Sequence, residues 1–163
     1  MRFYAFAFAA SAMVLGACGG GEKGAADSAA QQTGAAAPGA AAPAGGAAAA
    51  ITGTTHEVKM VGDAQGYRFE PANITVKAGD GVKYTMVSGG PHNVAFDEAG
   101  IPAGAKAQLD ANITDKMAEL SSNLKTNPGE TITISFANVP AGTYNYNCTP
   151  HLAMGMKGIV TVQ

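Results

Sequence analysis

The sequence predicts an all-β domain, an antiparallel sandwich or barrel with one short inserted helix, preceded by a disordered tail. From Thr54 onward, β-branched and aromatic residues alternate with polar ones, as they do in half-buried strands. Turn sequences rich in glycine, proline and asparagine interrupt these runs at short intervals, which is typical of sandwiches and barrels. With 163 residues, the chain is long enough for one such domain and a tail.

The first eighteen residues indicate an export signal. Arg2 is followed by an apolar stretch over 3–15, and small residues precede Cys18. A membrane anchor helix is the alternative, but a span needs about 20 apolar residues, and glycine, alanine and charge follow here. Residues 15–18, Leu-Gly-Ala-Cys, resemble the bacterial lipobox, whose cysteine becomes the lipidated first residue of the mature protein. We expect lipidation at Cys18, since an ordinary signal peptide would leave a free thiol in an oxidising compartment.

Residues 19–53 predict a flexible linker. They are almost entirely Ala, Gly, Pro, Gln, Ser and Thr, with no large apolar residue before Ile51. Pro38, Pro43 and scattered glycines interrupt every stretch long enough to nucleate a helix. A linker of this composition has an r.m.s. span of roughly 30 Å, so the domain over 54–163 could move along the surface beside its anchor.

Strands are expected in turn along this domain. The first ones are marked by alternating apolar positions, and later ones by continuous runs. The positions are Val58, Met60, Val61, Tyr67, Phe69, Ile74 and Val76, and the runs are 82–87, 131–136 and 158–162. Turn signals at 62–63, 79–81, 89–91, 127–129 and 140–142 separate them.

A short helix is expected between two of these strands. Ile113, Met117, Leu120 and Leu124 fall at helical spacing, and Asn112 or Thr114 could cap the start.

Composition narrows the possible partners. The net charge is −2 and the lysines are spread along the chain, so the basic surface that nucleic acid requires is not expected. The two cysteines, Cys18 and Cys148, have separate roles in this interpretation, so we expect no disulfide framework.

The segment 148–156 concentrates metal-binding side chains in a short loop between two strands. Singly, each has a more ordinary explanation, because a buried cysteine acts as a small hydrophobe and methionine fills cores. Together, Cys148, His151 and a methionine can point at one place, and thiolate, imidazole and thioether suit copper. A trigonal site of two histidines and one cysteine with a weak axial methionine is the arrangement of electron-transfer copper proteins.

His92 is the expected second histidine, because it follows the rigid turn 89–91 at the start of a strand. We interpret His56 as an ordinary strand or surface residue. Zinc is the rival metal, but structural zinc sites use closed sets of cysteine and histidine, and catalytic ones need an open position. Neither kind of zinc site would use the methionines as ligands.

Three segments resemble plastocyanin and its relative pseudoazurin, of the cupredoxin family. They are 69–80 (FEPANITVKAGD), 91–98 (PHNVAFDE) and 148–156, in the family's order. The resemblance spans nearly all of 54–163 and implies a Greek-key cupredoxin fold. It implies His92, Cys148 and His151 as equatorial copper ligands and Met156 as the axial one, with Met154 as the alternative. It also implies that Asn93 stiffens the cysteine loop.

The resemblance implies a monomeric electron carrier and not an enzyme. Leu152 and Ala153 would form part of an apolar patch for transient docking of redox partners near His151. Asn147 stands where plastocyanins usually have tyrosine, so their remote electron-entry route is not expected here. Nor is charge-steered docking of the plant type, because the acidic residues are scattered.

Two other functions stay open. A copper-delivery protein would want an exposed, methionine-rich site, at which Met154 hints, while the enzymes of this fold need more histidines than the three present. The export signal and lipobox place the expected carrier on the periplasmic side of a bacterial membrane, anchored by lipid.

Overall fold

The computed structural model describes residues 46–163. The predicted export signal, Cys18 and most of the linker lie outside the described residues, so the division at residues 18 and 53 stays a prediction. Among residues 46–163, no helix is both long enough and apolar enough to cross a membrane.

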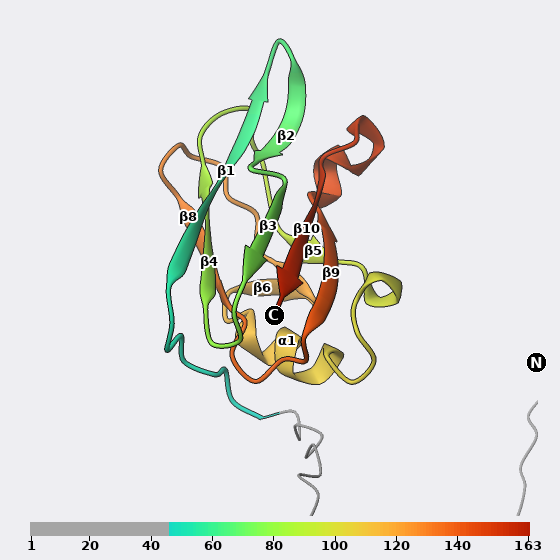
Figure 1. Ribbon diagram of the computed structural model, residues 1–163. Helices are drawn as coiled ribbons and strands as arrows, with labels where there is room; N and C mark the ends of the chain where they lie inside the picture. The colour runs from blue at the N-terminus through green and yellow to red at the C-terminus, as the bar shows by residue number, and fades with distance from the viewer. Residues whose placement is uncertain (1–45) are drawn as a thin grey trace, which may run out of the picture. The chain divides into compact units, whose positions relative to one another are not determined.

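Strands form two packed sheets, which confirms the predicted all-β fold with one short α-helix (Figure 1). In chain order the elements are β1 (Thr55–Asp63), β2 (Gly66–Glu70), β3 (Asn73–Val76), β4 (Gly81–Met86), β5 (Ala95–Phe96), the 3-10 turn η1 (Glu98–Gly100), α1 (Lys106–Asn112), β6 (Lys116–Ala118), β7 (Ser121–Ser122), β8 (Thr131–Ser135), β9 (Gly142–Asn147), the 3-10 turn η2 (Thr149–Met154) and β10 (Lys157–Val162). One sheet has the order β2-β1-β4-β8 and the other β3-β10-β9-β5-β7-β6.

Both sheets are mixed, where the sequence predicted antiparallel pairing. Most neighbours are antiparallel, but β1 pairs with β4 and β3 with β10 in parallel. The parallel pairs arise because the chain changes sheets between β2 and β3 and again between β3 and β4. Strands that are not consecutive then become neighbours, and no hairpin turn sets their direction.

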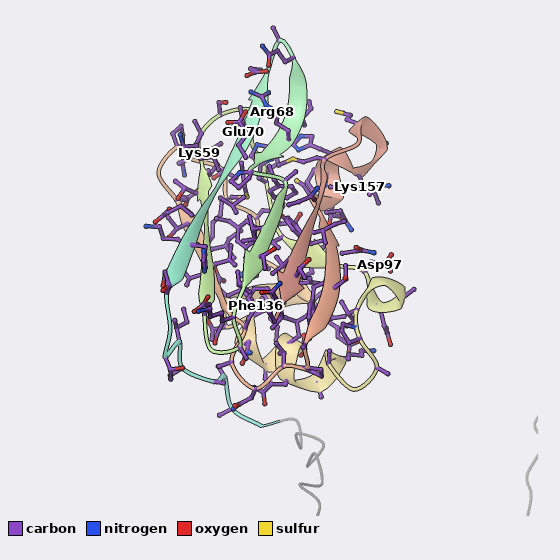
Figure 2. The ribbon with its side chains drawn as sticks, in the orientation of Figure 1. Lys59, Arg68, Glu70, Asp97, Phe136 and Lys157 are labelled. Atoms are coloured by element: carbon purple, nitrogen blue, oxygen red, sulfur yellow. The ribbon has the colours of Figure 1, made fainter. Side chains whose placement is uncertain are left out.

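The core lies between the sheets and is rich in aromatic side chains. Tyr84 of β4 and Tyr146 of β9 are fully buried with Phe69, and their rings meet edge to face. Phe136 is likewise buried among the side chains that fill the space between the sheets (Figure 2). This packing gives the strand ends a rigid base for the loops that they carry.

The predicted helix over 113–124 is wrong, because the chain there forms β6 and β7. Ile113 and Leu120 are buried, whereas Met117 and Leu124 are exposed, so the four residues do not share one helical face. Leu120 also has a positive φ of 56°, which no α-helix contains.

The observed helix α1 lies just before that segment. Its inward face carries Gln108, Leu109 and Asn112. The side-chain amide of Asn112 donates to the backbone oxygens of Ser135 and Ala137. Polar residues therefore occupy buried helix positions that a search for apolar spacing would miss.

Asp80 holds the start of β1 to the turn before β4, and we predict that it makes stability depend on pH. Its carboxylate accepts hydrogen bonds from the backbone N–H groups of Lys77 and Thr54, and His56 Nε2 lies 2.9 Å from it. Chiefly through the Lys77 bond, then His56 and Thr54, its pKa falls from 3.8 to about 2. The stabilisation is therefore complete above pH 3.8 and lost as the pH falls towards 2.

Asp80→Asn should remove this acid-dependent part of the free energy of unfolding. Urea unfolding of the metal-free protein between pH 2 and 5 measures it. The control is Asp97→Asn, which changes an exposed carboxylate that caps the turn η1. If the free energy of unfolding changes with pH in the same way in the Asp80 variant and the wild type, the prediction is contradicted.

Candidate metal centre

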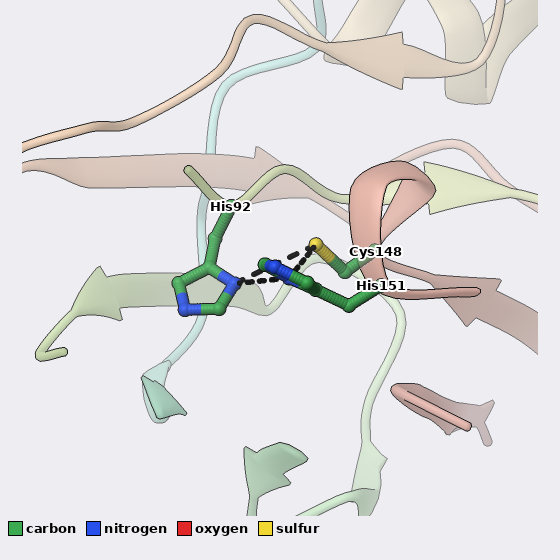
Figure 3. Close-up of side chains that lie close together, drawn as sticks. All are labelled: His92, Cys148 and His151. Atoms are coloured by element: carbon green, nitrogen blue, oxygen red, sulfur yellow. Dashed lines mark hydrogen bonds between the residues drawn. The ribbon is translucent and has the colours of Figure 1, made fainter. Parts of the chain in front are cut away.

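Three side chains from two segments, His92 from one and Cys148 with His151 from the other, meet beside the end of β9 (Figure 3). His92 Nδ1 lies 3.6 Å from Cys148 Sγ, His151 Nδ1 lies 3.4 Å from that sulfur, and the two nitrogens are 3.2 Å apart. All three residues are buried, and only His151 retains any exposure, at 6%.

Strand alternation explains why the thiol points inward. Tyr144 and Tyr146 of β9 are buried while Thr143 and Asn145 are exposed, and Cys148 continues the buried series at a period of two. The ladder between β9 and β10 therefore fixes the side of the sheet on which the sulfur lies.

The turn η2 returns the chain to this point within a few residues. The His151 N–H donates to the Cys148 oxygen, and the Met156 N–H donates to the His151 oxygen. Gly155 ends the turn in the left-handed region at φ 83°, which glycine adopts without strain. This compact turn brings His151 and Met156 back towards Cys148.

His92 is fixed from outside the turn. Its backbone exchanges hydrogen bonds with Lys125 at an isolated bridge, and its Nε2 lies 2.8 Å from the Ser88 carbonyl oxygen. A carbonyl oxygen only accepts, so Nε2 carries the proton. The Nδ1 lone pair is then free and faces Cys148 and His151, the orientation that a ligating imidazole needs.

Burial sets the protonation states of the three groups. It lowers the pKa of His92, partly offset by the bond to Ser88, and it lowers the pKa of His151, where the charge of His92 adds to the effect. Burial raises the pKa of the Cys148 thiol, while backbone N–H groups of Asn93 and His151 favour the thiolate. Neutral imidazoles are ready to donate lone pairs, and the thiol releases its proton when a cation binds.

The three donor atoms fit one metal ion. The point equidistant from atoms 3.2, 3.4 and 3.6 Å apart is about 2.0 Å from each of them, close to ordinary metal–nitrogen distances and slightly inside metal–sulfur ones. A thiolate with two imidazoles in a plane is the donor set of electron-transfer copper sites.

The two methionines of the loop differ in their surroundings. Met156 is fully buried and its backbone oxygen accepts from the Cys148 N–H, whereas the side chain of Met154 is 60% exposed. Of the two methionines, Met156 is therefore the buried one, and it is hydrogen-bonded to Cys148.

Asn93 links the segment of His92 to the cysteine loop. Its side-chain oxygen accepts from the Thr149 N–H at 2.7 Å, and its amide donates to the hydroxyls of Thr149 and Ser121. It is fully buried, and Thr149 directly follows Cys148. These contacts fit the predicted stiffening of the loop.

The predicted docking residues lie at the surface of η2. Leu152 is 44% exposed and Ala153 is exposed beside it, directly after His151. An apolar surface therefore adjoins the one donor residue that reaches solvent.

Two residues at the site were not singled out from the sequence. Tyr67 stacks on the His151 ring with centroids 3.7 Å apart and an interplanar angle of 12°, and Ser88 holds His92. The alternating pattern marked Tyr67 only as a strand position, and no sequence signal marked Ser88.

Comparisons with known proteins address the family of this chain. The model of a family described as copper binding proteins, plastocyanin/azurin family, matches residues 56–163. Chloroplastic plastocyanin of Tetradesmus obliquus is 41% identical over 114 residues, which are 70% of this chain and 71% of that one. Plastocyanin of Scenedesmus fuscus is 40% identical over 106 residues, 65% of this chain and 97% of that one.

A solved structure is similar as well. Oxidised plastocyanin from Dryopteris crassirhizoma is 34% identical, covers 66% of this chain and 99% of its own, and superposes with a TM-score of 0.50. The chain belongs to the plastocyanin/azurin family of copper-binding proteins.

Proposed function

We propose that this protein is a type 1 blue-copper carrier that shuttles single electrons between redox partners at the periplasmic surface of a membrane. The observation that carries the proposal is the buried triangle of His92, Cys148 and His151 donor atoms. Family membership confirms copper, the metal predicted from the sequence.

In this proposal His92, Cys148 and His151 are the equatorial ligands and Met156 is the weak axial one. Bound copper supplies a one-electron couple between Cu(I) and Cu(II). The soft sulfur donors of Cys148 and Met156 favour the reduced ion, and the imidazoles accept both states.

The chain's contribution is to hold these donors still. His92 is tied to Ser88 and Lys125, and the cysteine loop is tied to Asn93. Because each ligand is fixed by contacts outside the metal, its position changes little between oxidation states, and the reorganisation that each electron transfer requires stays small.

Electrons would leave and enter through His151, the donor residue that reaches solvent. Leu152 and Ala153 would form part of the apolar patch on which redox partners dock. A small apolar contact of this kind suits a transient complex that must separate after each transfer.

Copper loading tests the proposal directly. Cu(II) is added to the purified protein, and visible absorption and electron paramagnetic resonance spectra are recorded. An intense blue charge-transfer band with narrow copper hyperfine splitting is expected. A colourless protein, or one with only a weak square-planar copper signal, would overturn the proposal.

The two methionines should respond differently to substitution. Met156→Leu is expected to shift the visible band and the reduction potential, because it removes a buried thioether, whereas Met154→Leu changes a mostly exposed side chain and should alter neither. Spectra and voltammetry of the two variants make a matched pair. The opposite result would assign Met154 as the axial ligand.

Burial of the site argues against the copper-delivery alternative. Rapid exchange of metal requires open access, and His92, Cys148 and Met156 are all fully buried. An enzyme of this fold would need further histidines, and the third histidine, His56, lies against Asp80.

The proposed location depends on lipidation at Cys18, because the lipid would hold the protein to the membrane. In this proposal the protein is a monomer. The described part of the chain begins near α1, at the end of the domain opposite η2 (Figure 1), and Thr52 and Gly53 bond there to the Gly79 oxygen. The candidate copper site and the first described residues therefore lie at opposite ends of the domain, and this arrangement supports the proposal. Cys18→Ser should move the protein from the membrane to the soluble fraction, and unchanged fractionation would contradict the anchor.

A further inference from the structure

The β1–β2 hairpin reaches both histidines of the metal centre although it lies outside the loops that carry them. Figure 1 shows the hairpin extending at the same end of the domain as η2. On β2, Tyr67 lies flat on the His151 ring, with centroids 3.7 Å apart and planes 12° apart. The same tyrosine meets His92 edge to face at 6.2 Å.

The backbone of β1 positions this tyrosine. Gly62 pairs with Tyr67 across the hairpin, and a Cβ at Gly62 would lie only 2.7 Å from the tyrosine ring. The absence of a side chain at Gly62 therefore leaves the space in which the ring lies.

Gly62 is in turn connected to the other histidine. Its N–H donates to the Ser88 oxygen at 2.9 Å, and the Ser88 hydroxyl donates to the Gly62 oxygen at 3.0 Å. The same Ser88 oxygen accepts from His92 Nε2. A continuous series of contacts thus runs from His92 through Ser88, Gly62 and Tyr67 to His151.

Charged groups brace the tip of the hairpin. The Arg68 guanidinium binds both carboxylate oxygens of Asp63 at 2.8 and 2.9 Å, and its Nε donates to Glu70 (Figure 2). Neighbouring residues of a strand face opposite sides, so Arg68 braces the side away from Tyr67.

We propose that Tyr67 is a positioning residue for His151, and that the β1–β2 hairpin restrains both imidazoles through the Gly62–Ser88 contacts. This inference rests on the proposed copper function. His151 is the one donor residue with any exposure, so its imidazole must swing outward before copper can leave. The stacked tyrosine ring opposes that movement and keeps the ligand in place in both oxidation states.

The first test is the rate at which the Cu(I) protein loses its metal to the chelator bathocuproine disulfonate. An aromatic stack contributes about 0.5–1.5 kcal/mol, so Tyr67→Ala should release Cu(I) roughly two- to tenfold faster. Tyr67→Leu keeps apolar bulk without a ring to stack and should also release faster, while Tyr67→Phe should match the wild type. Met117→Ala is the control, since it removes an exposed apolar side chain from β6, the last strand in the order of its sheet.

A second readout does not need copper. In the metal-free protein, nuclear magnetic resonance signals of the His151 ring should broaden in Tyr67→Ala and Tyr67→Leu and stay sharp in Tyr67→Phe. Gly62→Ala, whose added Cβ would meet the tyrosine ring and the Gly89 backbone, should act in the same direction. Wild-type release rates and unchanged His151 signals in the Ala and Leu variants would overturn the inference.

The two proposals fail in different ways. If the wild type lacks the blue band, the carrier proposal fails, and the His151 signals of the metal-free variants still decide the role of Tyr67. If every variant is blue, releases Cu(I) at the same rate and keeps the His151 signals unchanged, only the positioning role is lost.

Discussion

Cys148→Ser is expected to abolish the blue absorption of the copper-loaded protein. The intense band depends on charge transfer from a thiolate to the metal, and a serine hydroxyl is a hard, weakly acidic donor that cannot replace it. Absorption and paramagnetic resonance spectra of the variant after addition of Cu(II) measure the loss. We expect at most a weak signal from copper held by the two imidazoles.

The control for this prediction is the other cysteine. Cys18→Ser replaces the cysteine that the sequence predicts to lie outside the domain, and it should leave the spectrum unchanged. Serine is nearly isosteric with cysteine, and its hydroxyl can donate to one of the two neighbouring Nδ1 atoms, that of His92 or that of His151, so the fold should survive. Circular dichroism checks this, and a persistent blue band in folded Cys148→Ser would show that the thiolate is not a ligand.

The sequence indicated the metal centre well because most of the candidate ligands lie close together in the chain. Cys148, His151 and Met156 lie in one short turn, and alternation along β9 already directs Cys148 to the buried side. His92 stands apart in sequence, but the Gly-Gly-Pro turn before it marks a rigid position. The structure brings the histidines and the cysteine together, while the roles of these residues as ligands stay predictions.

Features that depend on distant partners could not be predicted in this way. Tyr67 and His151 stack although 84 positions separate them, and a strand pattern does not show what a side chain will meet. The parallel pairing of β1 with β4 likewise depends on the path of the chain between sheets.

The misplaced helix has a different cause. Apolar spacing predicted a helix from Ile113. The helix that forms, α1, instead buries the amide side chains of Gln108 and Asn112, which bond to each other, and Asn112 also donates to a backbone oxygen. Gln108 also donates to the Ala47 oxygen, and Asn112 accepts from the Ala49 N–H. Buried polar residues that hold backbone segments leave no apolar pattern to detect.

Asn93→Ala is expected to cause a large loss of stability and to loosen the cysteine loop. Asn93 makes three hydrogen bonds at a fully buried position, and its removal leaves the Thr149 N–H and two hydroxyls without their partner. A buried polar group that loses its partner costs about 1–3 kcal/mol, so the free energy of unfolding should fall by about 2–4 kcal/mol. Urea unfolding of the metal-free protein measures this fall.

Two further variants separate the individual contacts. Ser121→Ala removes one partner of the Asn93 amide and should cost about 1 kcal/mol, the usual contribution of one hydrogen bond. Asn93→Asp keeps an oxygen that can accept from the Thr149 N–H and should retain more stability than Asn93→Ala. If Asn93→Ala costs no more than Ser121→Ala, the bond to Thr149 does not hold the loop. The position of Cys148 would then depend on the β9–β10 ladder and on the backbone hydrogen bonds of Cys148 to His151 and Met156.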